Sequence, residues 1–188
     1  MTTTPVQNDL LLSAAAYARW VDPGDDPTEL VRGRVVREPR PSVRHGAVQA
    51  ELASLLISHV RESDAGTVLT ESGVILFRDP DTVRGPDVAF YARDRLPDPL
   101  PDGFAETAPD LVAEILSPHD TATGLQARIR DYLGAGVRLI WVLDPQGGTV
   151  TVYRSPNDIR LLSGDEILEG EEVLPGFRVG VGELLRRS

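Results

Sequence analysis

Two acidic residues inside apolar segments are the residues of this sequence best suited to chemistry. Asp87 stands directly before the apolar residues 88–91, and Glu114 interrupts the apolar residues 111–116. Short apolar runs of this kind are typical of buried strands. A carboxylate that is buried without a partner is costly, so such an acid normally binds a cation, a metal or hydrogen-bond donors. Two of them meeting at one edge of a sheet would offer hard oxygen ligands suited to Mg²⁺.

The composition indicates an ordinary soluble domain and excludes thiol chemistry. Apolar residues make up 41% of the chain and charged residues 26%, which is usual for a globular protein. The absence of cysteine excludes disulfides, thiolate metal sites and cysteine nucleophiles. The first residues lack a basic leader, and no apolar stretch has membrane-spanning length, so we expect a cytoplasmic protein that does not contact a membrane.

The charged residues limit both the partner and the mechanism. A net charge of −10 argues against a nonspecific polyanion binder, although a local basic strip would still permit a nucleic-acid enzyme. All 19 basic residues are arginine, so a mechanism that needs a lysine ammonium is not available.

The basic strip falls in residues 32–44, where Arg32, Arg34 and Arg44 are the candidate phosphate contacts. The period of two predicts that Arg32 and Arg34 share a strand face; a solvated edge strand protected by charge is an equally good interpretation.

The elements that must position these residues alternate between helix and strand. Helical spacing predicts helices over 8–20, 45–61 and 121–133. Apolar runs predict a hairpin or bent strand pair over 29–37, and strands at 67–71, 74–77, around Asp87, around Glu114, at 138–144, at 149–154 and near Leu161, Val173 and Val179. This order predicts an α+β fold in which helices pack against a mixed sheet.

Several short motifs occur in an order that resembles a known family. They are residues 29–33, His45-Gly46, residues 71–73, residues 86–88, residues 114–118, Tyr132, Gly136-Val137 and residues 141–145. From about residue 9 to 185 the chain resembles the Uma family of proposed endonucleases, which are grouped with the restriction-endonuclease-like PD-(D/E)XK superfamily. The resemblance implies one domain over residues 1–188 with an α/β/α-like nuclease core, an N-terminal hairpin and C-terminal strands. It also implies a DNA substrate and, together with the apolar strand at residues 140–142, a homodimer.

The resemblance also implies roles for individual residues. In the superfamily an Asp and a Glu hold Mg²⁺ or Mn²⁺, and these would be Asp87 and Glu114 here, with the carbonyl of Ile115 as a neutral ligand. The metal would polarise the scissile phosphate and lower the pKa of a bound water. Glu51, on the first long helix, is a candidate extra ligand, or else an exposed helix acid. Glu71 either lines the site or makes an ordinary hydrogen bond at the end of a strand.

The sequence departs from the family pattern at the lysine. Leu116 stands two residues after Glu114, where the superfamily has its lysine, and the family moves that lysine to the place of Arg128. A guanidinium can neutralise phosphate charge, but it cannot act as a base at neutral pH. Gln126 could orient a water. The alternative function is therefore a catalytically degenerate nuclease fold kept as a binding or dimeric scaffold.

Purely structural interpretations remain open for each of these residues. Asp87 could cap a turn, and Glu114 could pair with an arginine inside the sheet. The three histidines, His45, His59 and His119, show no zinc-site spacing. They are interpreted as residues of helix ends or of the surface.

Overall fold

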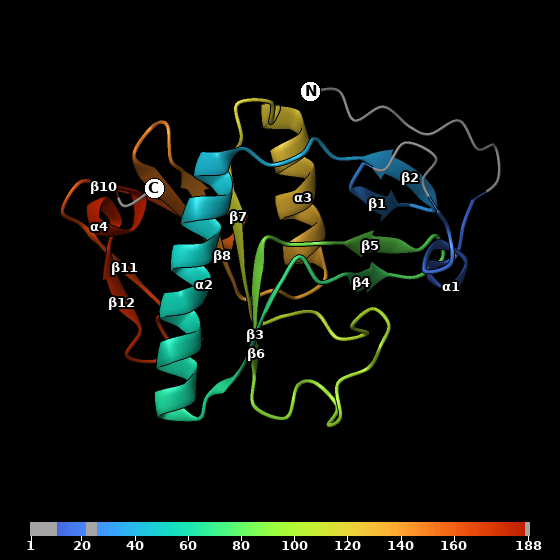
Figure 1. Ribbon diagram of the computed structural model, residues 1–188, viewed down its shortest axis with the longest axis horizontal. Helices are drawn as coiled ribbons and strands as arrows, with labels where there is room; N and C mark the ends of the chain where they lie inside the picture. The colour runs from blue at the N-terminus through green and yellow to red at the C-terminus, as the bar shows by residue number, and fades with distance from the viewer. Residues whose placement is uncertain (1–10, 22–25, 187–188) are drawn as a thin grey trace.

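A mixed six-stranded sheet forms the centre of the molecule (Figure 1). The computed structural model describes residues 11–21 and 26–186. The strand order is β10-β9-β8-β7-β6-β3, and all neighbours are antiparallel except β7 and β8, which are parallel. The strands are β3 (Gly66–Thr70), β6 (Val88–Ala92), β7 (Leu111–Ile115), β8 (Leu139–Asp144), β9 (Thr149–Ser155) and β10 (Asp158–Ser163).

Two helices cover the two faces of this sheet, which gives the α/β/α layering that was predicted (Figure 1). The helices are α2 (Val43–Ser63) and α3 (Ala122–Gly134). In β7, Leu111, Ala113 and Ile115 pack with α2, whereas Val112 packs with α3. Because strand residues alternate between faces, Glu114 lies on the side of α3. The alternation therefore decides which helix can contact this carboxylate.

Both long helices begin with a side-chain cap. The Ser42 hydroxyl accepts a hydrogen bond from the His45 amide at the start of α2, and the Thr121 hydroxyl accepts one from the Gly124 amide at the start of α3. Such caps satisfy amides that have no partner inside the helix. The helices predicted over 45–61 and 121–133 are thus confirmed, with ends shifted by one or two residues.

A second sheet of four antiparallel strands projects from the central sheet, in the order β2-β1-β5-β4 (Figure 1). The turn between β1 and β2 is formed by Arg32 (φ 50) and Gly33 (φ 76), as a two-residue hairpin with positive φ at both positions requires. The Gly33 amide bonds to the carbonyl of Asp81, so the hairpin tip rests on the neighbouring turn. The strands are β1 (Thr28–Val31), β2 (Arg34–Arg37), β4 (Val74–Phe77) and β5 (Thr82–Arg84).

The C-terminal elements extend the core on the side of α2. They are β11 (Ile167–Glu169), β12 (Arg178–Gly180) and α4 (Val181–Arg186). Leu168 and Leu184 are fully buried with Trp141 of β8 in one apolar cluster. Helix α4 was not predicted, because its six residues are too few to show a helical period.

One further expectation needs correction. Within the predicted helix over 8–20, the described residues form only the single turn α1 (Ala14–Tyr17), and residues 8–10 lie outside the described part. The segments 67–71 and 74–77 are strands as predicted, and the two strands, β3 and β4, belong to different sheets. Among the residues that the structure describes, no helix is long and apolar enough to cross a membrane.

Candidate active site

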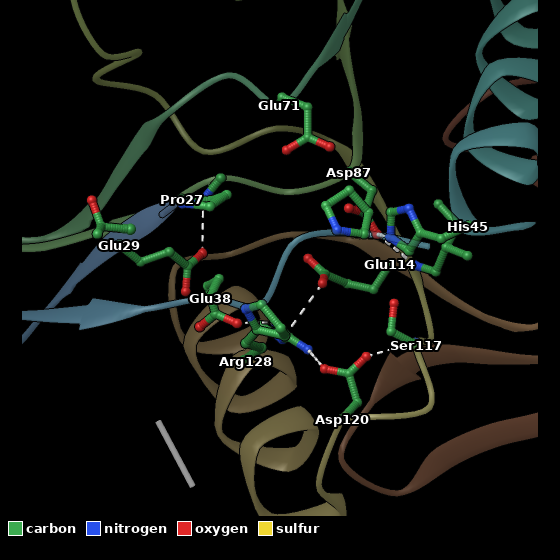
Figure 2. A pocket seen from close by; sticks show the side chains of 15 residues that line it. Pro27, Glu29, Glu38, His45, Glu71, Asp87, Glu114, Ser117, Asp120 and Arg128 are labelled. Atoms are coloured by element: carbon green, nitrogen blue, oxygen red, sulfur yellow. Dashed lines mark hydrogen bonds and ion pairs between the residues drawn. The ribbon is translucent and has the colours of Figure 1, made fainter. Parts of the chain in front are cut away.

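A cavity of about 260 Å³ lies where the two sheets meet the first turns of α2 and α3. It is bordered by the open end of the β1–β2 hairpin, the ends of β3 and β7, and the segment that leads into α3 (Figure 2). Six carboxyl side chains line it, against one guanidinium and one imidazole. They are Glu29, Glu38, Glu71, Asp87, Glu114 and Asp120, with Arg128 and His45. The cavity therefore has an excess of negative charge.

Asp87 is held between the central sheet and α2. Its Oδ2 atom accepts a hydrogen bond from the Ile115 amide at 2.6 Å and lies 3.1 Å from Nε2 of His45. Gln49 donates its side-chain amide to the Asp87 carbonyl at 2.9 Å. The side chain is 14% exposed. Atoms of β7 and α2 thus fix the carboxylate at the wall of the cavity.

Glu114 enters the same cavity from the face of the sheet that α3 covers. Its Oε1 accepts a hydrogen bond from the Tyr132 hydroxyl at 2.6 Å, and its Oε2 lies 3.5 Å from Nε of Arg128. Burial raises the pKa of Glu114 to about 8, and the nearby charge of Asp87 acts in the same direction although Arg128 opposes it. Glu114 therefore lies close to an arginine and also lines the same cavity as Asp87. The sequence suggested these two arrangements as alternatives, and the structure contains both.

Arg128 lies within reach of three carboxylates. It donates to Asp120 at 2.7 Å and to Glu38 at 3.4 Å, besides its approach to Glu114 (Figure 2). Burial and the charge of Glu29 raise the pKa of Glu38 to about 7. Arg128 is thus the counter-ion of the cavity and reaches it from α3. Leu116, in contrast, packs into the apolar cluster beneath α3.

Gln126 does not line the cavity. It is exposed, two residues before Arg128 on α3. Two residues correspond to about 200° around a helix of 3.6 residues per turn. The two side chains therefore point in nearly opposite directions, and a direct role for Gln126 in orienting a water at the cavity is not supported by its position.

His45 and Gln49 are site residues that sequence reasoning missed. His45 was interpreted as a residue of a helix end or of the surface; it does lie in the first turn of α2, but it is 5% exposed and contacts Asp87. Burial lowers the pKa of His45, while the hydrogen bond to Asp87 and its charge raise it, and the net pKa lies above its ordinary value. Gln49, one helical turn later, also donates to Glu71 at 2.7 Å. The i, i+4 spacing of these two polar residues was the signal available in the sequence.

Glu51 is not placed in the cavity. It stands two residues after Gln49 on α2, points away from that side chain by the same helical geometry, and is absent from the cavity lining. It is partly buried. A role as an extra metal ligand has no support from this position, whereas Glu71, which does line the cavity, has such support.

The basic strip divides into two regions. Arg32 and Arg34 are exposed at the tip of the hairpin, whose other end borders the cavity. They do not share a strand face, because Arg32 is in the turn with a positive φ. Arg44 is exposed in the first turn of α2, next to His45. Only Arg44 of these three residues lies near the acidic cavity.

The carboxylate oxygens that line the cavity are the type of ligand atom that hard divalent cations prefer. Among the described residues, no group of three or more His, Asp or Glu side chains could hold a metal by itself. However, Mg²⁺ commonly binds through one or two carboxylates and takes its remaining ligands from water and substrate phosphates. Asp87 and Glu114 meet that minimum, and the surplus negative charge around them favours a cation.

A match to a family model shows which family the chain belongs to. That model matches residues 14–182, and its description is "Uma2: Putative restriction endonuclease". The chain belongs to the Uma2 family. A solved structure described as "a putative nuclease belonging to DUF820" from Anabaena variabilis ATCC 29413 is similar to this chain, with 23% sequence identity and a TM-score of 0.81. The match covers 94% of this chain and 98% of that chain. This likeness confirms the predicted nuclease-like fold. No curated protein matched this Uma2 chain.

Proposed function

We propose that this Uma2 protein is a divalent-metal-dependent endonuclease that hydrolyses phosphodiester bonds of DNA. The observation that supports this most is the meeting of Asp87 and Glu114 at one cavity. Asp87 directly precedes β6 and Glu114 lies in the neighbouring strand β7, and the Ile115 amide that follows Glu114 donates to Asp87 at 2.6 Å. A purely structural role would not require six carboxyl groups around one space.

In this proposal each residue has a limited role. Asp87 and Glu114 hold Mg²⁺ or Mn²⁺, with the carbonyl of Ile115 as a further oxygen donor. The metal, when bound, supplies Lewis-acid polarisation of the scissile phosphate and activation of water. His45 holds the Asp87 carboxylate in place through its contact at 3.1 Å. Arg128 offsets negative charge that develops on the phosphate, since a guanidinium cannot accept a proton at neutral pH.

Cleavage assays with charge-removing variants test the proposal. The parent should cut DNA with Mg²⁺ or Mn²⁺, and Asp87→Asn or Glu114→Gln should abolish cutting, because each removes an anionic ligand. The same two variants should lose the rise in melting temperature that Mn²⁺ gives the parent. Glu51→Gln is the matched control, since Glu51 is an acid of α2 outside the cavity lining. Cutting by both Asp87→Asn and Glu114→Gln at the parent rate would refute the site.

A catalytically degenerate scaffold is the second candidate function. One observation favours it: Arg128 already neutralises Glu114 and Asp120 at the place of the family's lysine. If this function is correct, Mn²⁺ should not raise the melting temperature of the parent, and no DNA form should be cut. A clear Mn²⁺-dependent rise that depends on Asp87 and Glu114 would decide against the scaffold.

A further inference from the structure

Two further cavities adjoin the acidic cavity and share lining residues with it. The first, of about 560 Å³, lies between the hairpin and α3 and shares Glu38, Asp120 and Arg128. The second, of about 500 Å³, lies between the start of α2 and the turn after β8, and shares His45, Ser117 and Asp120. The three cavities are therefore neighbours that meet at these shared side chains.

The flanking cavities lead in different directions from the centre. The residues that belong only to the larger one come from the hairpin, β5 and the start of α3. Those that belong only to the smaller one come from the start of α2, the segment after β7 and the β8–β9 turn. In Figure 1 the hairpin and α2 stand on either side of the upper end of α3, where that helix begins. A ligand that occupies all three spaces would thus enter on one side of the acidic centre and leave on the other.

The charges differ between the centre and the flanks. The centre has six carboxyl groups against Arg128 and His45. The hairpin-side cavity has Arg37, Arg84, Arg128 and His119 against three carboxyl groups. The α2-side cavity has Arg44 and His45 against two carboxyl groups. Anionic ligand groups are thus better accepted at the flanks than at the centre, where a cation is needed.

Arg37 and Arg44 are the flanking cations best placed for a phosphate. Of the other two guanidinium groups that line the hairpin-side cavity, Arg84 is only 5% exposed and Arg128 faces the acidic centre. Arg37 is partly buried at the end of β2, and Arg44 is exposed on α2. The capped first turns of α2 and α3 also border these spaces, and the positive ends of helices favour anions.

We propose that one continuous polynucleotide strand crosses all three cavities, with flanking phosphates at Arg37 on the hairpin side and at Arg44 on the α2 side. This inference rests on the proposed function and deepens it. A strand on this path would continue on both sides of Asp87 and Glu114, so the enzyme would need no free strand end. The substrate is therefore cut internally, and the hairpin-tip arginines take no part in binding.

Binding of a fluorescent oligonucleotide tests the path. The assay uses the full chain with Ca²⁺ in place of Mg²⁺, and follows affinity against salt. Arg37→Gln and Arg44→Gln should each weaken binding and reduce the salt slope by about 0.7 for a single strand, since each removes one phosphate contact. Arg37→Lys and Arg44→Lys keep the charge and should restore the slope. Arg34→Gln is the matched control, because Arg34 lies on the same strand as Arg37 but at the hairpin tip.

A second measurement tests the internal cut. Covalently closed single-stranded circles should be cut by the parent as readily as linear strands of the same sequence. Unchanged salt slopes for both Arg37→Gln and Arg44→Gln would overturn the inference while leaving the proposed function intact. Trimming of linear strands without cutting of circles would overturn both the path and the endonuclease assignment. If the parent neither binds nor cuts any polynucleotide, the proposed function fails and the path fails with it.

Discussion

At the scale of single residues, Arg128 has two roles that conflict. Its guanidinium compensates Glu38, Glu114 and Asp120, so it stabilises the fold when no metal is bound. The same contacts reduce the negative charge that a divalent cation would find at Glu114. An arginine in this place therefore favours a stable protein over tight metal binding.

Replacing Arg128 should separate these roles. We expect Arg128→Gln to lower the unfolding free energy by about 3–5 kcal/mol, because breaking a buried ion pair leaves uncompensated charge. Mn²⁺ should bind this variant at least as tightly as the parent and restore part of the lost stability, whereas cleavage should slow. Arg128→Lys should keep or raise cleavage, since an ammonium can approach a water more closely and can titrate when buried. Calorimetry and cleavage rates measure both effects; loss of Mn²⁺ binding in Arg128→Gln would contradict this assignment.

The pKa values of Glu38 and Glu114 predict how stability depends on pH. Both carboxyls have raised pKa values in the folded protein, to about 7 and about 8, mainly because of burial. Above the unfolded value of 4.5 the unfolded chain loses these protons before the folded chain does, so stability falls as pH rises from about 4.5 to about 8.

The expected loss is at most about 8 kcal/mol, because the two pKa values lie about 2.5 and about 3.5 above 4.5 and one pKa unit corresponds to about 1.4 kcal/mol. Urea unfolding of the metal-free protein between pH 5 and pH 8.5 measures it. The double variant Glu38→Gln/Glu114→Gln should remove most of the dependence. Stability that rises with pH over this range would show that these carboxyls are ionised in the folded state.

At the scale of elements, a buried ion network joins the second sheet to α3. Arg84 of β5 donates to Glu29 of β1 at 2.6 Å and to Asp131 of α3 at 2.5 Å, and Glu29 also accepts the Gly85 amide. Gly85 and Pro86 are followed by Asp87, so this network fixes the chain that leads into the site.

Removing this guanidinium should cost much more than removing an exposed one. We expect Arg84→Met to lower the unfolding free energy by about 3–5 kcal/mol, because Glu29 would remain buried without a counter-ion. Arg154→Met is the control, since Arg154 pairs with Glu171 and Asp158 near the surface, and it should cost about 0–1 kcal/mol. Chemical denaturation measures both values. Equal losses of unfolding free energy in the two variants would mean that the buried network contributes no more stability than a surface ion pair.

At the scale of the whole molecule, the structure changes the basis for expecting a homodimer. The apolar strand at residues 140–142 is central in the six-stranded sheet, and Ile140 and Trp141 are fully buried. It therefore cannot form an interface. Ile159 and Leu161, in contrast, are 51% and 60% exposed on β10, which is an edge strand of that sheet. Exposed apolar side chains on an edge strand are unusual unless another chain covers them.

We still expect a homodimer, with β10 of each copy at the interface. Sedimentation at micromolar concentration should give twice the chain mass of 20.4 kDa, and Ile159→Lys/Leu161→Lys should give the monomer, because charges at an apolar interface oppose association. Val43→Lys is the control, since Val43 is an exposed apolar residue that belongs to α2 and not to β10. A monomeric parent would remove the homodimer from the proposal.

The sequence by itself determined the local elements and the two principal acids. Period-two and helical spacing placed the strands around Asp87 and Glu114 and the helices α2 and α3, because those patterns depend on near neighbours along the chain. The order of short motifs determined the family and the nuclease-like fold. The resemblance to the family also implied that Arg128 stands at the place of the family's lysine.

Only the tertiary structure decided which side chains meet. His45 contacts Asp87 across 42 residues, and Arg128 contacts Glu38 across 90, and no local pattern encodes such pairs. The turn at Arg32 places two of the three predicted phosphate contacts, Arg32 and Arg34, at the hairpin tip, and the positive φ of Arg32 means that they do not share a strand face. The rotation of about 200° between Gln126 and Arg128 around α3 likewise directs the Gln126 side chain away from the cavity. Spacing along the chain fixes which face of its own element a residue occupies, whereas packing between elements fixes what that face contacts.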